Sequence, residues 1–146
     1  MRISVACDHG ALELKNAVVA HLQKQGHEVH DFGTHTLDSC DYPEFASAAA
    51  KAVAGGACDR GIVMCTTGIG MSIAANKVDG IRCALLSDLM SARLTREHND
   101  TNMMAMGAGV VGTMLAIKIA DTWLDTPFSG DERHQRRIDK VMALEK

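Results

Sequence analysis

Short apolar runs alternate with longer amphipathic segments along most of the chain. Runs of about four to six mostly apolar residues are typical of buried strands, whereas apolar residues spaced three or four apart are typical of helices. The predicted strands are Ile3–Cys7, Glu28–Phe32, Arg60–Cys65, Ile81–Leu86 and Met103–Met106. The predicted helices cover about 11–25, 43–54, a segment after residue 70, 88–98, 114–124 and 131–146.

Strands that alternate with helices predict a parallel sheet covered by helices on both faces. We therefore expect one domain over residues 1–146, of the α/β class: a three-layer α/β/α sandwich with a five-stranded parallel, Rossmann-like sheet. In such sheets ligands bind beyond the carboxyl ends of the strands, where the strand order reverses. If the second and third strands flank the first, that point brings Asp8 and His9 beside the loop that begins at Cys65.

Composition and charge argue against several classes of protein. The net charge of -3 does not suit a nucleic-acid-binding protein, and no apolar run is long enough to span a membrane. The five cysteines form no Cys-x-x-Cys pair, and the first strand begins at Ile3, which leaves no room for a signal peptide. They predict reduced thiols in a cytoplasmic protein, with neither a disulfide framework nor a metal site. Aromatic residues make up only 3% of the chain, which gives little support to cofactor stacking.

The loop after the third predicted strand carries the candidate chemistry. Cys65 ends an apolar run and is followed by glycines at positions 68 and 70 and by an alanine-rich segment, which indicates a strand, a tight turn and a helix start. Backbone N–H groups at a helix start bind anions and favour a thiolate, so the loop could offer a base beside an oxyanion pocket. A small buried structural cysteine fits the same local pattern. The loop lacks the lysine of a nucleotide P-loop, and Met71 stands where a cysteine-dependent phosphatase has its arginine.

Five motifs, in order along nearly the whole chain, resemble the ribose-5-phosphate isomerase type B family, which includes galactose-6-phosphate and allose-6-phosphate isomerases. The motifs are Ala6–Gly10, Asp41–Pro43, Cys65–Lys77, Arg96–Asn102 and Arg133–Arg137. The resemblance implies a sugar-phosphate isomerase that needs neither metal nor cofactor and works through an enediolate. It also implies a homodimer with shared active sites, alone or paired into a tetramer, and a C-terminal helix over about 131–146 that packs at a subunit interface.

The resemblance also implies roles for individual residues. Cys65 matches the base that moves a proton between C1 and C2, and Thr67 matches part of the anion-stabilising turn. His98, with Asp8 nearby, matches the group that opens the furanose ring, and in the family it comes from the partner subunit. The implied substrate-binding residues are His9, Tyr42, Thr66, Gly68, Ile69, Gly70, Met71, Ser72, Asn99, Arg133 and Arg137.

Physical chemistry allows these roles but also allows simpler ones. Histidine can both give and take a proton near neutral pH, as ring opening requires. Arg133 and Arg137, four positions apart, share one helix face and can fork onto a phosphate dianion. Taken singly, His98 could only stabilise a helix end, Asp8 could only cap a helix, and the arginines could form a solvated face. The combination favours a site.

Two positions depart from the family pattern. Thr66 replaces the usual glycine, and Gly109 replaces an arginine that binds phosphate in the ribose enzymes. Conversion of ribose 5-phosphate to ribulose 5-phosphate is the leading prediction. The alternatives are an isomerase of allose 6-phosphate, galactose 6-phosphate or a tetrose 4-phosphate, and a non-catalytic sugar-phosphate-binding module. A cysteine hydrolase is the least favoured, because the arginine expected at Met71 is missing.

Overall fold

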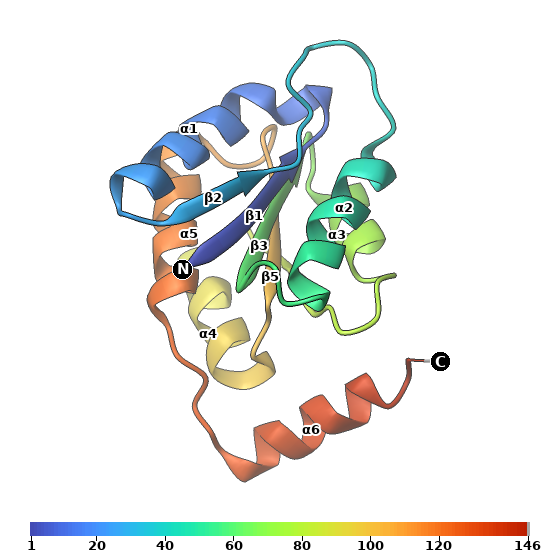
Figure 1. The fold of residues 1–146 in the computed structure, drawn as a ribbon. Helices are drawn as coiled ribbons and strands as arrows, with labels where there is room; N and C mark the ends of the chain where they lie inside the picture. The colour runs from blue at the N-terminus through green and yellow to red at the C-terminus, as the bar shows by residue number, and fades with distance from the viewer. Residues whose placement is uncertain (146) are drawn as a thin grey trace.

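A computed structural model describes residues 1–145 as a five-stranded parallel sheet between two layers of helices (Figure 1). The predicted fold class is confirmed. The strands are β1 (Arg2–Cys7), β2 (Glu28–Asp31), β3 (Arg60–Cys65), β4 (Cys83–Leu85) and β5 (Met103–Gly107). The helices are a short 3₁₀ turn, η1 (His9–Ala11), and α1 (Leu12–Lys24), α2 (Tyr42–Ala54), α3 (Ile69–Ala75), α4 (Leu89–Asn99), α5 (Thr113–Asp125) and α6 (Glu132–Met142). Within residues 1–145, none of these helices has the length and apolar character needed to cross a bilayer.

The strand order β2-β1-β3-β5-β4 creates the expected reversal next to β1. β2 and β3 pair with β1 on opposite sides, both in parallel. Cys7 is in register with Met64, so the residues that follow β1 and β3 leave the same edge of the sheet side by side. That edge is where α/β sheets bind ligands.

Alternate side chains along the central strands enter two separate cores. Ile62 and Met64 of β3 pack with α1, α4 and α5, in a core that includes the buried Trp123. Val63 and Cys65 point to the other face, toward α2 and α3. The α2 side of this second core is lined by alanines, which allow a helix to lie close to the sheet. Cys65 thus ends a strand that is buried on both faces.

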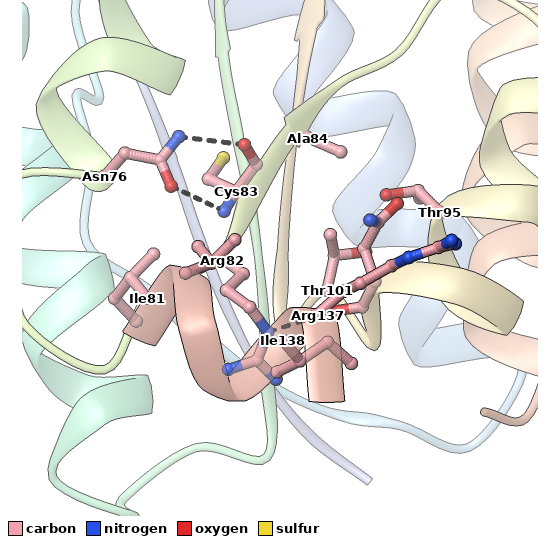
Figure 2. A pocket seen from close by; sticks show the side chains of 11 residues that line it. Asn76, Ile81, Arg82, Cys83, Ala84, Thr95, Thr101, Arg137 and Ile138 are labelled. Carbon is pink, nitrogen blue, oxygen red and sulfur yellow. Dashed lines mark hydrogen bonds between the residues drawn. The ribbon is translucent and has the colours of Figure 1, made fainter. Parts of the chain in front are cut away.

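The largest differences from the predicted bounds lie at the β4 edge and at the C-terminus. The strand predicted over 81–86 is reduced to β4, because β4 is an edge strand that pairs only with β5. On its other side the Asn76 amide accepts from the Cys83 N–H and donates to the Cys83 carbonyl, each at 2.8 Å (Figure 2). The helix predicted over 131–146 ends at Met142, and Lys146 lies outside the described residues.

Candidate active site

The turn after β3 places the Cys65 sulfur beside a main-chain donor. Cys65 is 6% exposed, and the Gly68 N–H donates to its Sγ at 3.1 Å. Gly68 has a φ of 78°, a left-handed conformation that glycine adopts easily, and this lets the chain turn back over the sulfur. The Cys65 sulfur thus lies at the mouth of a turn that also presents main-chain donors.

The first turn of α3 adds further donors next to this sulfur. Thr67 Oγ1 accepts from the Ile69 N–H at 3.3 Å, and the Ser72 N–H donates to the Gly68 carbonyl at 3.0 Å. The amides of residues 70 and 71 have no backbone or side-chain acceptor within residues 1–145, as expected for a helix start. Met71 is 0% exposed as a whole residue and does not line the cleft in front of Cys65, whereas Gly70 does. Of the amides predicted to bind an anion, the Gly70 N–H is therefore the one that remains for an oxyanion.

A cleft of about 430 Å³ opens in front of Cys65 and is lined by residues from three segments. Asp8 is 8% exposed and its Oδ1 accepts from the Gly10 N–H at 2.9 Å, so it caps η1 while it lines the cleft. The Tyr42 ring packs against Gly70, where an added Cβ would lie 2.8 Å from the ring. The cleft-lining residues are Asp8, Tyr42, Cys65, Thr66, Thr67, Ile69, Gly70 and Ile73.

His9 lies in η1, directly after Asp8, at the same edge of the sheet. Its Nδ1 accepts from the Cys40 N–H at 3.3 Å, and the Cys40 sulfur lies 3.8 Å from the same nitrogen. A neutral imidazole that accepts at Nδ1 carries its proton on Nε2. His9 can therefore offer an N–H donor to an anion, which is compatible with its predicted role as a phosphate ligand.

The two departures from the family pattern, Thr66 and Gly109, lie in contact with each other. The Gly109 N–H donates to the Thr66 carbonyl at 2.8 Å, and a Cβ at position 109 would lie 3.3 Å from Thr66 Cγ2. A Cβ at Gly10 would collide with the Thr66 hydroxyl. The Thr66 side chain thus fills the space between the loops that follow β1 and β5.

His98, Asn99, Arg133 and Arg137 lie away from this cleft. α4 runs from the carboxyl edge of the sheet back to the edge where β5 begins, so His98 and Asn99 lie at the opposite edge from Cys65. Asn99 and Arg137 line a separate cavity of about 300 Å³ (Figure 2). The structure therefore does not bring His98 near Asp8 within one chain, because the length of α4 separates them.

Sequence reasoning assigned no role to His134, whose ring stacks on that of His98. The ring centroids are 4.3 Å apart and the planes differ by 18°. On α6, His134 and Ile138 are buried while Arg133 and Arg137 are exposed. The spacing of four between these two buried positions was a signal that His134 lies on the packed face of the helix.

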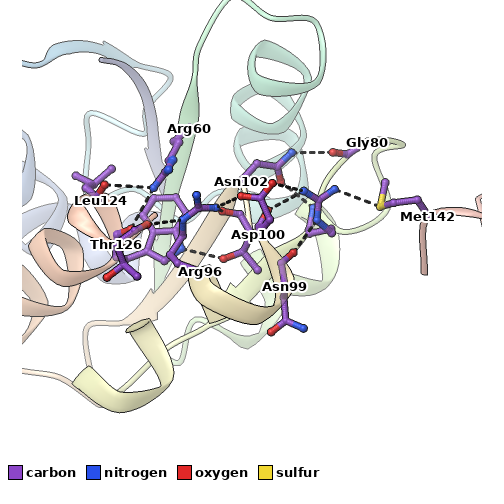
Figure 3. A network of polar contacts seen from close by, with 12 residues as sticks. Arg60, Gly80, Arg96, Asn99, Asp100, Asn102, Leu124, Thr126 and Met142 are labelled. Carbon is purple, nitrogen blue, oxygen red and sulfur yellow. Dashed lines mark hydrogen bonds and ion pairs between the residues drawn. The ribbon is translucent and has the colours of Figure 1, made fainter. Parts of the chain in front are cut away.

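A network of arginines fixes the chain that follows His98 (Figure 3). Arg82 donates to the Asn99 carbonyl at 3.0 Å and to the Asp100 carbonyl at 2.7 Å. Arg96 is 4% exposed, donates to the Thr101 carbonyl at 2.5 Å and pairs with the Asp100 carboxylate at 2.7 Å. Asp100 ends α4 in a left-handed conformation, with a φ of 44°. These contacts hold the last turn of α4 in one place.

Three of the other cysteines are poor candidates for a base. Burial raises the pKa of the Cys7 and Cys83 thiols to about 12 and also raises the pKa of Cys58. All three therefore stay protonated near neutral pH. Within residues 1–145, no group of three or more His, Cys, Asp or Glu side chains is arranged to hold a metal ion.

Comparison with known proteins identifies the class to which this fold and cleft belong. The model of the Ribose/Galactose Isomerase family matches residues 3–141. The chain belongs to this family, and the resemblance seen in the five motifs is confirmed.

Among its relatives, ribose-5-phosphate isomerase B of Escherichia coli (strain K12) is 49% identical over 144 residues, which cover 99% of this chain and 96% of that protein. The structure of ribose-5-phosphate isomerase B from Clostridium thermocellum has a TM-score of 0.97 and 51% identity, covering 99% and 97% of the two chains. A third similar structure is that of ribose-5-phosphate isomerase B from Mycoplasma genitalium with bound ribulose-5-phosphate. It has a TM-score of 0.94 and 39% identity, covering 99% and 95%.

Proposed function

We propose that the chain interconverts ribose 5-phosphate and ribulose 5-phosphate. Cys65 removes the C2 proton of the open-chain aldose, and the Gly70 amide stabilises the negative charge of the enediolate. The same thiol then returns a proton to C1. The observation that carries the proposal is a cysteine sulfur 3.1 Å from a main-chain N–H, in a cleft that also holds the unpaired Gly70 amide. One donor aimed at an oxyanion is worth about 2.7 to 4 kcal/mol in comparable enzymes.

We further propose that a second copy of the chain completes each site. The Cys65 cleft continues into a surface where α3, β4 and α4 expose apolar side chains, a feature that marks protein–protein contacts. These side chains belong to Ile69, Ile73, Leu85, Leu89 and Met90.

A second copy on this surface would supply the residues that one chain holds at its other edge. His98 would open the furanose ring, since an imidazole can both donate and accept a proton. Arg133 and Arg137, exposed on one face of α6, would join His9 on the phosphate. The prediction that α6 packs at a subunit interface belongs to this proposal.

We also infer that the protein works in the cytoplasm. All five cysteines are free thiols, and Cys40 is only partly buried. Free and partly accessible thiols persist in a reducing compartment.

The experiment that tests the reaction compares Cys65→Ala with Cys58→Ala. Both variants remove a buried thiol, but only Cys65 lines the cleft. We expect Cys65→Ala to lower ribose 5-phosphate isomerisation by about 10² to 10⁴-fold, the range for losing a general base. It should equally slow deuterium incorporation from D₂O, while circular dichroism stays unchanged and Cys58→Ala stays active. Wild-type turnover in Cys65→Ala would reject the role of the thiol. Binding of ribose 5-phosphate by the wild-type chain without isomerisation would instead identify a sugar-phosphate-binding module.

The contact between Thr66 and Gly109 favours one alternative, an isomerase for a different sugar phosphate. In the family pattern position 109 carries a phosphate-binding arginine, and here a side chain at this position would press on Thr66. Four-, five- and six-carbon aldose phosphates should therefore be assayed side by side for ketose formation. A higher kcat/KM with a four- or six-carbon substrate than with ribose 5-phosphate would establish this alternative.

A further inference from the structure

We propose that His134 is a positioning residue that holds the His98 imidazole for ring opening. This inference rests on the proposed function, because it takes His98 to be the group that acts on the furanose ring. It is carried by the parallel stack of the two rings, whose centroids are 4.3 Å apart with an interplanar angle of 18°. A ring stacked in this way cannot rotate freely about its side-chain bonds.

His134 is more buried than His98, as expected if His134 holds the ring of His98 in place. His134 is 7% exposed and faces into the molecule beside Ile138, whereas His98 is only half-buried. His98 lines a cavity of about 300 Å³ with residues of β4 and α4, including Leu85 and Asn99. One face of the His98 ring is therefore covered by His134, while the residue still borders an accessible cavity. His134 itself is placed to act through His98 rather than on a ligand.

Contacts at both ends of α6 fix His134 relative to α4. The Ser129 N–H donates to the Glu97 carbonyl at 3.2 Å, which ties the segment before α6 to the residue next to His98. In the first turn of α6, the His134 N–H donates to the Asp131 carbonyl at 2.9 Å. At the other end, Arg82 lies 3.4 Å from the Met142 sulfur. The stack thus joins two helices that are already held together.

Burial and the charges around His134 both favour the neutral form of its ring. Burial lowers the pKa of His134, and the nearby His98, Arg133 and Arg137 lower it further, while Asp131 acts in the opposite direction. A stack in which His134 stays neutral can accommodate a proton on His98 without a second positive ring against it. In this proposal His134 holds the ring in place and His98 exchanges the proton.

The test separates ring opening from proton transfer. Ribulose 5-phosphate cannot form a furanose, because its C5 oxygen carries the phosphate, so its exchange of C1 hydrogen with D₂O needs no ring opening. We expect His134→Ala to lower ribose 5-phosphate turnover by about tenfold or more, as small misplacements of catalytic groups do. Exchange into ribulose 5-phosphate should stay near the wild-type rate. His134→Phe keeps a flat ring in the stack and should recover most of the turnover. Gln135→Ala, an exposed neighbour on α6, is the control and should leave both rates unchanged.

Several results would overturn the role of His134. Equal losses of turnover and exchange in His134→Ala would mean that the residue only supports the structure or substrate binding. No loss in either rate, or a His134→Phe variant as slow as His134→Ala, would exclude the stack as the cause. Failure of the proposed function looks different, because the wild-type chain would then fail to isomerise ribose 5-phosphate or Cys65→Ala would keep its exchange.

Discussion

At the scale of single residues, two glycines let the loop after β3 lie in direct contact with the end of β5. A Cβ at Gly107 would lie 2.5 Å from the Thr67 carbonyl carbon, and a Cβ at Gly68 would lie 2.7 Å from the Met106 carbonyl carbon. Main-chain atoms cannot move aside as the end of a flexible side chain can. The Thr67 main chain therefore packs directly against the end of β5, and this contact fixes the turn that faces the Cys65 sulfur.

Gly107→Ala should disturb both stability and catalysis. The added methyl group meets the main chain of Thr67, so we expect a loss of about 1 to 3 kcal/mol in the free energy of unfolding, as for other overpacked sites. Turnover should fall as well, because the turn that carries the donors must shift. Urea denaturation and the isomerase assay measure the two effects. Gly112→Ala is a matched control, since a Cβ there meets no atom within 4 Å, and it should cost at most about 1 kcal/mol as a change at a helix N-cap. Equal behaviour of the two variants would contradict the proposed contact.

At the scale of elements, a buried lysine anchors the loop between β2 and α2. Lys15 of α1 is 0% exposed, and its Nζ donates to both Asp31 carboxylate oxygens, at 2.9 and 2.8 Å, and to the Thr34 carbonyl at 2.8 Å. Asp31 also accepts from the Gly33 N–H at 2.9 Å. One ammonium group thus joins α1, the end of β2 and the start of a loop that later reaches His9.

Replacing this lysine should loosen the loop. We expect Lys15→Met to lower the free energy of unfolding by about 2 to 3 kcal/mol, below the usual cost of breaking a buried ion pair because the Asp31 side chain is 26% exposed. The KM for ribose 5-phosphate should rise, since the loop supplies the N–H that orients His9. Lys24→Met, in the exposed last turn of the same helix, should change stability by no more than about 0.5 kcal/mol. Unchanged thermal unfolding and KM in Lys15→Met would refute the anchoring role.

The elements also show why sequence reasoning succeeded in some places and failed in others. β1, β3 and β5 were predicted almost to the residue, because strands that are buried on both faces consist mostly of apolar residues. β4 was predicted too long, since its edge position depends on β5 inserting between β3 and β4, which the order along the chain does not reveal. The same insertion creates the contact between Thr66 and Gly109.

One part of the candidate site could be predicted from the sequence and another part could not. Asp8 and the turn after Cys65 could be placed together from sequence, because the carboxyl ends of adjacent parallel strands must converge. The stack of His98 on His134 could not, since it joins two helices whose packing is set by tertiary contacts.

At the scale of the whole molecule, the predicted site residues form two groups at opposite edges of the sheet. Cys65 ends β3 and Asp8 follows β1, both at the carboxyl edge, whereas His98 lies at the end of α4, near the start of β5, and Arg137 lies on α6. If both groups act on one substrate, as proposed above, a single chain cannot bring them together without a large rearrangement. In a symmetric dimer, each chain can supply the residues that the cleft of the other chain lacks, so two copies can complete two sites.

Complementation between inactive chains tests this arrangement. If sites are shared, co-expressing Cys65→Ala with His98→Ala in equal amounts should restore about one quarter of the wild-type activity, because half of randomly paired dimers are mixed and each holds one intact site. Each variant expressed alone should be nearly inactive on ribose 5-phosphate. A mixture no more active than its parents would mean that every site lies within one chain.

The fluorescence of the single tryptophan can report on the edge of the sheet at which α4 ends. Trp123 is fully buried, donates to Thr101 Oγ1 at 2.9 Å and lies under the Arg60 guanidinium, 5.3 Å from the ring centroid. Its emission therefore senses the packing around the end of α4, while the modification of Cys65 by a thiol reagent, assigned to that residue by peptide mass spectrometry, senses the opening of the cleft. Fluorescence and labelling rates recorded during unfolding would show whether the Cys65 cleft and the packing around the end of α4 are lost together or in sequence.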